Sequence, residues 1–207
     1  MAFRPKSGIK GSMLREFVVW YSEANPGKLQ QVIEGLSEEL QAPFDPAHPT
    51  LGMLPSRWYP APAVHAVIDS MLDGMLARDV NQLAQMAGAT TVARMKDNGV
   101  YNLFFRWVLR PSNYSKIIQA MWTLNYDSGR LETIDHGPCR QEGRVHDWNS
   151  HHPFLCRTNI AVKRSVWEAM GCIGARIEEQ FCISDGAPYC GSVISWQPGT
   201  PRDEPEG

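Results

Sequence analysis

The chain has 207 residues, of which 43% are hydrophobic and 20% are charged, and its formal net charge at pH 7 is -2. This length and composition fit one globular domain with a sizeable core, and the near-neutral charge argues against nucleic acid or an anionic membrane surface as the partner. No apolar run approaches the roughly 20 residues needed to span a bilayer, and no apolar segment of a secretory signal is present. Five cysteines, an odd number, favour reduced thiols in a cytoplasmic protein over a disulfide framework.

Composition along the chain predicts one domain between two loose ends. Residues 1–11 are basic and glycine-containing, and we interpret them as a flexible lead-in. Residues 198–207 lack apolar side chains, so they have no surface to bury that would offset the entropy of ordering. We therefore expect a single domain over 12–197 and a disordered tail over 198–207.

The first half of the domain is predicted to be mainly helical. The run Phe17–Tyr21 is rich in β-forming residues and favours a strand, although a short helix also fits it. Residues 43–62 hold many prolines and are expected to be irregular, whereas 101–109 are apolar and interpreted as a helix. A glycine C-cap is expected to close the last helix of this half at 127–129. Four segments show amphipathic helical periodicity, namely 26–40, 64–76, 80–95 and 111–126.

In the second half the helical period gives way to strands. Short strands are expected at 131–135 and 144–148, followed by a long helix that begins at His152-Pro153 and ends at Gly171. Two further strands, 175–183 and 189–196, are predicted to form a closing hairpin. Helices followed by strands indicate an α+β domain, with a helical N-terminal part packed on a mainly antiparallel sheet.

Two cysteines flank the turn of this hairpin. Such a hairpin brings Cys182 and Cys190 close together, and a third thiol from elsewhere would nearly complete a tetrahedral metal site. Two alternatives stay open at this point. The thiols also suit ordinary core packing, because free cysteine is one of the most frequently buried residue types, and the pair could form a disulfide.

The order of elements over 153–196 resembles a known family. A long helix, a glycine, a strand ending in Glu-x-x-Cys, a glycine-containing turn, Tyr-Cys and a final strand resemble the C-terminal half of the V4R (4-vinyl reductase) domain. That family shares its fold with haem-NO/oxygen-binding domains and with the vesicle-tethering TRAPP subunits. The wider chain is similar to myxobacterial V4R-related proteins through four segments, namely 57–60, 99–101, 126–129 and 190–196.

The resemblance implies a zinc site. V4R domains of phenol-sensing transcription activators hold zinc through one cysteine early in the last helix, a glutamate and two cysteines of the hairpin. The matching residues here are Cys156, Glu179, Cys182 and Cys190. Four protein ligands make a closed site, so the zinc would be structural. Cys172 is a substitute candidate, and Cys139 is expected to lie outside the site.

The same relatives enclose an aromatic effector, which implies a pocket. Its candidate residues here are Phe104, Trp107, Tyr126 and Trp148, although core packing is the more common role for any single one of them. The main hypothesis is thus a non-enzymatic domain that binds a small apolar or aromatic ligand or a protein partner. Apolar stripes between Val64 and Met95 would supply a homodimer surface unless the domain's own core buries them.

Two alternatives belong to other classes of protein. One is a tetrapyrrole-binding enzyme or accessory, as the vinyl-reductase name suggests, although no nucleotide-binding motif is present. The other is a haem gas sensor with His65 as axial ligand. Against it, the Tyr-x-Ser-x-Arg motif of the haem branch has no match here, the nearest string being Tyr114–Lys116. His146, His151 and His152 could build an open site, but such residues also serve as caps and surface groups.

Overall fold

The computed structural model describes residues 7–97 and 111–198. The first half holds two short strands and five helices among its described residues: β1 (Gly8–Lys10), α1 (Gly11–Ala24), α2 (Lys28–Glu34), α3 (Glu38–Gln41), β2 (Trp58–Pro60), α4 (Ala61–Leu72) and α5 (Ala77–Asp97). The second half holds α7 (Pro111–Thr123), β3 (Arg130–Asp135), β4 (Arg140–His146), α8 (Pro153–Ala169), β5 (Arg176–Phe181), the 3₁₀ helix η1 (Ile183–Asp185) and β6 (Cys190–Ser195). The predicted α+β class is confirmed.

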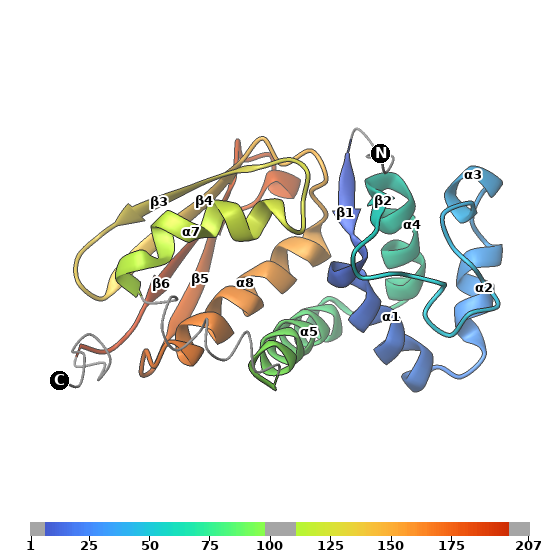
Figure 1. Ribbon diagram of the computed structural model, residues 1–207, viewed down its shortest axis with the longest axis horizontal. Helices are drawn as coiled ribbons and strands as arrows, with labels where there is room; N and C mark the ends of the chain where they lie inside the picture. The colour runs from blue at the N-terminus through green and yellow to red at the C-terminus, as the bar shows by residue number, and fades with distance from the viewer. Residues whose placement is uncertain (1–6, 98–110, 199–207) are drawn as a thin grey trace.

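The second half is built on an antiparallel sheet of strand order β3-β4-β6-β5. Helices α7 and α8 pack against this sheet, and α1 to α4 form the other end of the molecule with the β1-β2 pair (Figure 1). A bridge between Ile9 and Tyr126 ties the N-terminal strand to the segment that follows α7. The two halves are therefore joined through backbone pairing as well as through packing.

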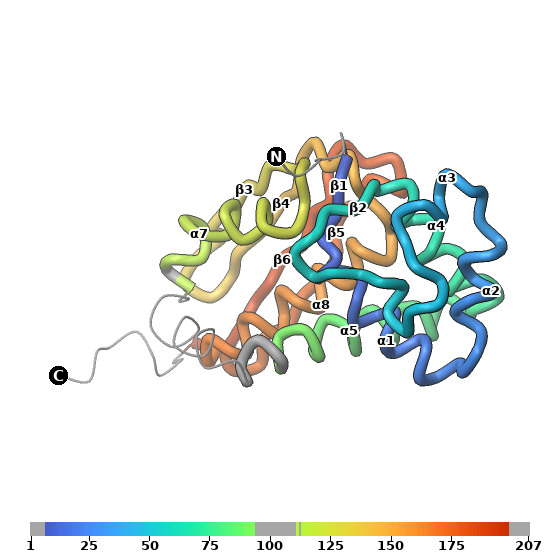
Figure 2. The backbone as a smooth tube through the Cα atoms, turned by 45° about the vertical axis from the view of Figure 1, so that its right-hand side comes forward, coloured from blue at the N-terminus to red at the C-terminus, as the bar shows by residue number. Residues whose placement is uncertain are grey.

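Helices α5 and α8 lie side by side and connect the two halves (Figures 1 and 2). Their closest approach is at the buried Gly88, where an added Cβ would stand 2.6 Å from Cβ of Ala161 and 2.7 Å from the backbone nitrogen of Val162. Only a residue without a side chain lets the two backbones come so close. The crossing fixes α8, and with it the residues that α8 contributes to the site below.

The core consists of two clusters. The larger one joins α1, α2 and α4 to the start of α8 and includes Trp148, Phe154 and the cysteines at 156, 182 and 190. The smaller one lies under α7, α8 and β6 around Trp167, which is fully buried. In α4 the apolar stripe that was expected to supply a dimer surface is buried in the larger cluster instead, so the alternative reading of that stripe is correct.

Three local expectations need correction. Phe17–Tyr21 lies within α1, so the strand is wrong and the helix is right, because Leu14, Phe17 and Val18 recur at helical spacing and are buried together. The periodic segment 26–40 splits into α2 and α3 around Gly35. Gly129 is not a helix C-cap, since α7 ends at Thr123; its φ of +105° belongs to a turn packed on Trp122. The helix expected at 101–109 and most of the tail lie outside the described residues.

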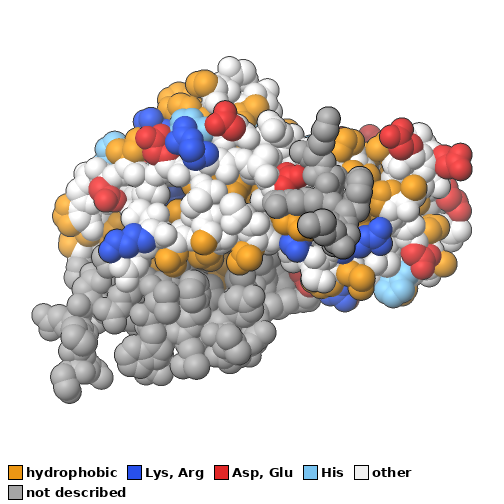
Figure 3. Space-filling model, turned by 45° about the horizontal axis from the view of Figure 1, so that its top comes forward, with side chains coloured by type: hydrophobic (Ala, Val, Ile, Leu, Met, Phe, Trp, Pro, Cys, Tyr) orange, Lys and Arg blue, Asp and Glu red, His pale blue; other side chains and the backbone are white. Residues whose placement is uncertain are grey.

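On the surface, charged and apolar side chains are interspersed on the face shown in Figure 3. Within the described segments, no helix has both the length and the apolarity to cross a membrane.

Candidate functional site

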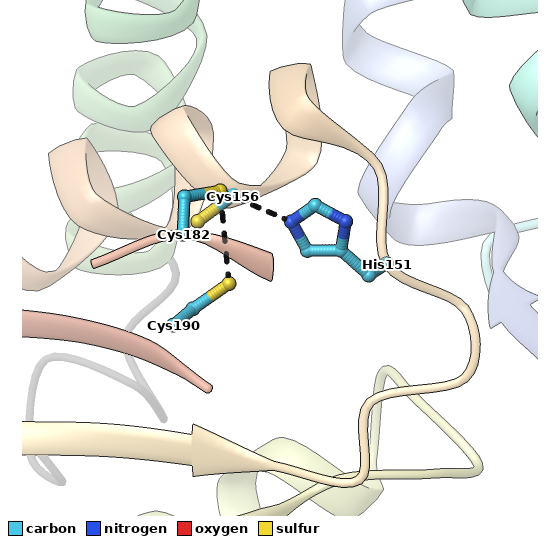
Figure 4. Close-up of side chains that lie close together, drawn as sticks. All are labelled: His151, Cys156, Cys182 and Cys190. Carbon is cyan, nitrogen blue, oxygen red and sulfur yellow. Dashed lines mark hydrogen bonds between the residues drawn. The ribbon is translucent and has the colours of Figure 1, made fainter. Parts of the chain in front are cut away.

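Three cysteines and one histidine meet where α8, the loop before it and the β5-β6 hairpin come together (Figure 4). Cys156 lies in the first turn of α8, and His151 in the loop just before that helix. Cys182 follows β5 directly, and Cys190 is the first residue of β6. The side-chain donor atoms of all four lie within 4.8 Å of one another.

The loop that carries His151 is held from several sides. Asp147 makes the corner after β4 with a φ of +53°, a conformation that asparagine and aspartate tolerate better than most residues. The backbone nitrogen of His151 donates to Trp148 O at 3.2 Å. Next to it, His152 caps α8: its Nδ1 accepts from the backbone nitrogen of Phe154, and its Nε2 lies 3.0 Å from Asp69 Oδ1. These contacts direct the His151 ring toward the cysteines.

The hairpin positions the other two thiols. A bulge between Glu179 and Phe181 interrupts the alternation of β5 just before Cys182, and such bulges redirect the side chains that follow them. The carbonyl of Cys182 then accepts from the backbone nitrogens of Asp185 and Ala187, which closes the turn. Cys190 begins the return strand, with its Sγ 3.8 Å from Sγ of Cys182.

Two of the donor separations match the edges of a tetrahedral zinc site. With Zn–S near 2.3 Å and Zn–N near 2.0 Å, tetrahedral geometry gives edges of about 3.8 Å between two sulfurs and about 3.5 Å between sulfur and nitrogen. The observed separations are 3.8 Å between the sulfurs of Cys182 and Cys190 and 3.4 Å from Cys182 Sγ to His151 Nε2. Thiolate and imidazole are ligands that zinc prefers, so the residues present fit this metal.

Protons are unequally shared among these thiols. A hydrogen bond from the Cys156 thiol, assisted by His151, holds the pKa of Cys190 below its ordinary value. The same hydrogen bond, together with burial, raises the pKa of Cys156, and burial raises that of Cys182. The cluster therefore favours one thiolate before any metal binds, and metal binding would displace the remaining thiol protons.

Of the four predicted ligands, the three cysteines converge and Glu179 stands at the edge of the cluster. Glu179 is exposed, and its Oε1 lies 3.9 Å from Cys156 Sγ, while His151 stands in the fourth place. The sequence already showed His151 beside the start of α8, but not that the loop turns its ring inward. Cys172 packs in the smaller core cluster and Cys139 lies in the β3-β4 turn, so neither joins the site. Metal binding itself stays a prediction.

An apolar cavity of about 130 Å³ lies beside the cluster, between α7, α8 and the sheet. It is close in size to the roughly 150 Å³ engineered cavity that binds benzene in another protein. Trp148, Cys156 and Cys190 line it, so the cavity and the cluster share a wall. The Trp148 ring also packs edge-on against the His151 ring, with 5.0 Å between their centres.

The four predicted pocket residues are placed differently. Trp148 lines the cavity. Tyr126 is buried behind it, where its hydroxyl accepts from Nδ2 of Asn159, itself a lining residue. Phe104 and Trp107 lie outside the described residues. Of the four residues, Trp148 is the one that the structure places on the cavity wall, and the ligand pocket itself stays a prediction.

By sequence, no protein-family model and no curated protein matches the chain. By structure, it is similar to the unliganded Fe(II) H-NOX protein from K. algicida, with a TM-score of 0.64 at 10% identity over 91% of this chain and 97% of that one. An H-NOX protein from S. oneidensis in the Fe(II)NO state gives 0.57 at 15% identity over 91% and 99%. An oxygen-binding H-NOX domain related to soluble guanylate cyclases gives 0.59 at 10% over 96% and 100%.

These matches define the class of fold. The chain adopts the fold of H-NOX domains, and the matches cover 91–96% of its length. The resemblance to V4R domains is supported at the level of this related fold, and the narrower assignment to that family is not.

Among the described residues no histidine is placed to hold haem, the group named for another H-NOX neighbour, in this cavity. All six histidines of the chain are described, and none of them lines the cavity. His65, the expected axial ligand, contacts the carbonyl of Ser150 through Nε2 at 3.2 Å. The cavity is also smaller than the roughly 300–1,000 Å³ pockets of drug-sized ligands. The partners of the other five histidines are Thr50, Glu142, Glu132, Cys182 and Asp69.

Proposed function

We propose that this chain is a non-enzymatic sensor domain whose cavity binds a small apolar or aromatic molecule beside a structural Cys₃His zinc centre. The observation that carries the proposal is the wall shared by the two sites, to which Cys156 and Cys190 both contribute. Zinc bound there would tie α8 to the β5-β6 hairpin and so hold two sides of the cavity in place.

The lining of the cavity supports an apolar ligand. Its walls include Ile118, Met121, Leu131, Val145 and Ile160, together with the faces of two tryptophans. Apolar surface in a preformed cavity gains affinity from burying apolar ligand atoms, at roughly 25 cal/mol per Å². A volume of about 130 Å³ limits the ligand to about one ring.

Binding of a single-ring probe tests this function. We expect phenol to bind the purified protein in isothermal titration calorimetry and to raise its melting temperature. Ile118→Trp fills the cavity from α7 and is expected to abolish phenol binding. Leu124→Trp, which adds the same ring just after that helix at a residue that is 67% exposed, is the matched control and should bind phenol normally. Phenol binding that persists in Ile118→Trp would contradict the proposal.

A haem gas sensor is the second candidate, and the fold comparison favours it, because the matched structures include an H-NOX protein in which haem distortion was probed and an oxygen-binding H-NOX domain. A cysteine thiolate is the axial ligand that the cavity wall offers, since Cys156 and Cys190 line it. Titration with haemin separates the candidates. A stoichiometric Soret band that is lost in Cys190→Ser would establish haem binding and overturn the zinc centre.

A homodimer and a protein partner remain proposals. Among the described residues the most exposed large apolar side chains are Leu124, Leu54 and Leu76, which belong to different parts of the fold. Sedimentation equilibrium at micromolar concentration tests self-association directly.

A further inference from the structure

Lys163 brings an amine to the wall of the cavity. It lies on α8, its side chain is partly buried, and it lines the cavity near Ser192 of β6. Its Nζ donates to the hydroxyl of Ser192 at 3.3 Å and to the carbonyl of the same residue at 3.4 Å. Both hydrogen-bond acceptors of the amine in the described segments, the hydroxyl and the carbonyl of Ser192, are therefore neutral.

Gly143 makes room for this amine. A Cβ at position 143 would lie 2.7 Å from Nζ of Lys163. Gly143 is in the middle of β4 and does not have the positive φ that would require glycine for backbone reasons. Its missing side chain thus leaves space in which the Lys163 amine rests on the backbone of the sheet.

The charges that line the cavity do not cancel. Three charged residues line it, and two of them, Glu132 and Arg144, lie 3.9 Å apart as an ion pair. The neighbouring carboxylate of Glu142 is engaged by Arg144 and by His136. Lys163 makes no ion pair with any residue of the described segments. Its charge therefore borders a largely apolar space with no ion-pair partner in the described segments, and the only opposite charge that acts on it is that of Glu142, which Arg144 and His136 already engage. This arrangement costs free energy until an anion arrives.

We propose that the ligand of this cavity is a small carboxylic acid with an apolar body of about one ring, bound with its carboxylate on Lys163 and Ser192. The inference rests on the proposed function, because it names the ligand class of the same cavity. The ammonium of Lys163 and the hydroxyl of Ser192 donate to the two carboxylate oxygens, and the apolar walls enclose the body. Charge-assisted hydrogen bonds of this kind are about twice as strong as neutral ones.

Calorimetry with benzoate and benzyl alcohol tests the inference, since the two probes share a ring and differ in charge. We expect the wild-type protein to bind benzoate at least tenfold more tightly than benzyl alcohol at pH 7. Lys163→Met keeps an unbranched side chain only one atom shorter and removes its charge. This variant should lose about ten- to hundredfold in benzoate affinity, as expected for one hydrogen bond to a charged group, and keep its affinity for benzyl alcohol within twofold.

Gly143→Ala provides a second variant that keeps the charge. Its new methyl group displaces the amine, so benzoate binding should weaken while benzyl alcohol binding stays unchanged. Equal wild-type affinity for the two probes, or equal losses for both in Lys163→Met, would overturn the acid ligand and leave the apolar cavity of the proposed function standing. If benzoate, benzyl alcohol and phenol all fail to bind, the proposed function falls as well.

Discussion

The charge of Lys163 is expected to destabilise the unliganded protein. Burial lowers the pKa of Lys163 from 10.5 to about 8, and the charge of Glu142 only partly opposes this. A pKa difference of this size corresponds to at most about 3.5 kcal/mol, at roughly 1.4 kcal/mol for each pH unit, and solvent contact of the partly buried side chain reduces it to about 3 kcal/mol or less. Between about pH 8 and pH 10.5 the unfolded chain binds more protons here than the native one. The contribution of Lys163 to the free energy of unfolding therefore becomes more favourable as the pH rises from about 8 to 10.5. Below about pH 8 its destabilising effect is fully present.

Lys163→Met removes this titration. We expect the variant to be more stable than the wild-type protein at pH 7, by up to about 3 kcal/mol, with the difference vanishing near pH 10.5. Urea unfolding followed by tryptophan fluorescence, at several pH values from 7 to 10.5, measures it. Lys116→Met, on the exposed face of α7, is the control and should leave the stability nearly unchanged. A Lys163→Met variant that is less stable than wild type at pH 7 would refute the reasoning, because the amine would then contribute favourable interactions of its own.

Two further predictions concern the ligand set and the helix crossing. His151→Ala should lose bound zinc in metal analysis, whereas Glu179→Gln should retain it; the opposite result would place Glu179 in the fourth position. Gly88→Ala should lower the free energy of unfolding by about 1–2 kcal/mol, because overpacking at Ala161 outweighs the gain of about 1 kcal/mol in helix propensity. In Gly35→Ala the new Cβ would lie 3.4 Å from the carbonyl oxygen of Gln31, an ordinary contact, so crowding should not destabilise this variant. Equal effects of the two changes would count against the close crossing.

The sequence predicted those helices and strands in which apolar residues recur with a helical or strand period. Helix α5 and the β5-β6 hairpin follow from local sequence, and the three cysteines converge because that hairpin forms where expected. The strand expected at Phe17–Tyr21 failed because burial of one helical face outweighed β propensity. The sequence pattern indicates His151 only as one of three neighbouring histidines, with His146 and His152, and not as a partner of the cysteines. Its position beside the cysteines depends on the turn at Asp147, a tertiary feature that no local sequence pattern predicts.

The sequence predicted the residues that line the cavity less well than it predicted the cysteine cluster. Trp148 was among the expected pocket residues, but Lys163 was not, because a lysine on an amphipathic helix ordinarily faces solvent. Its burial follows from two distant residues, Gly143 and Ser192, which the sheet brings beneath α8.

A zinc centre formed by three cysteines and His151 in an H-NOX-like fold can be tested by elemental analysis of the untagged protein by plasma mass spectrometry, with an absorbance spectrum of the same sample. We expect about one zinc per chain, no Soret band, and loss of the metal in Cys182→Ser. Iron with a Soret band, or a folded protein without metal after purification in the presence of zinc, would contradict it.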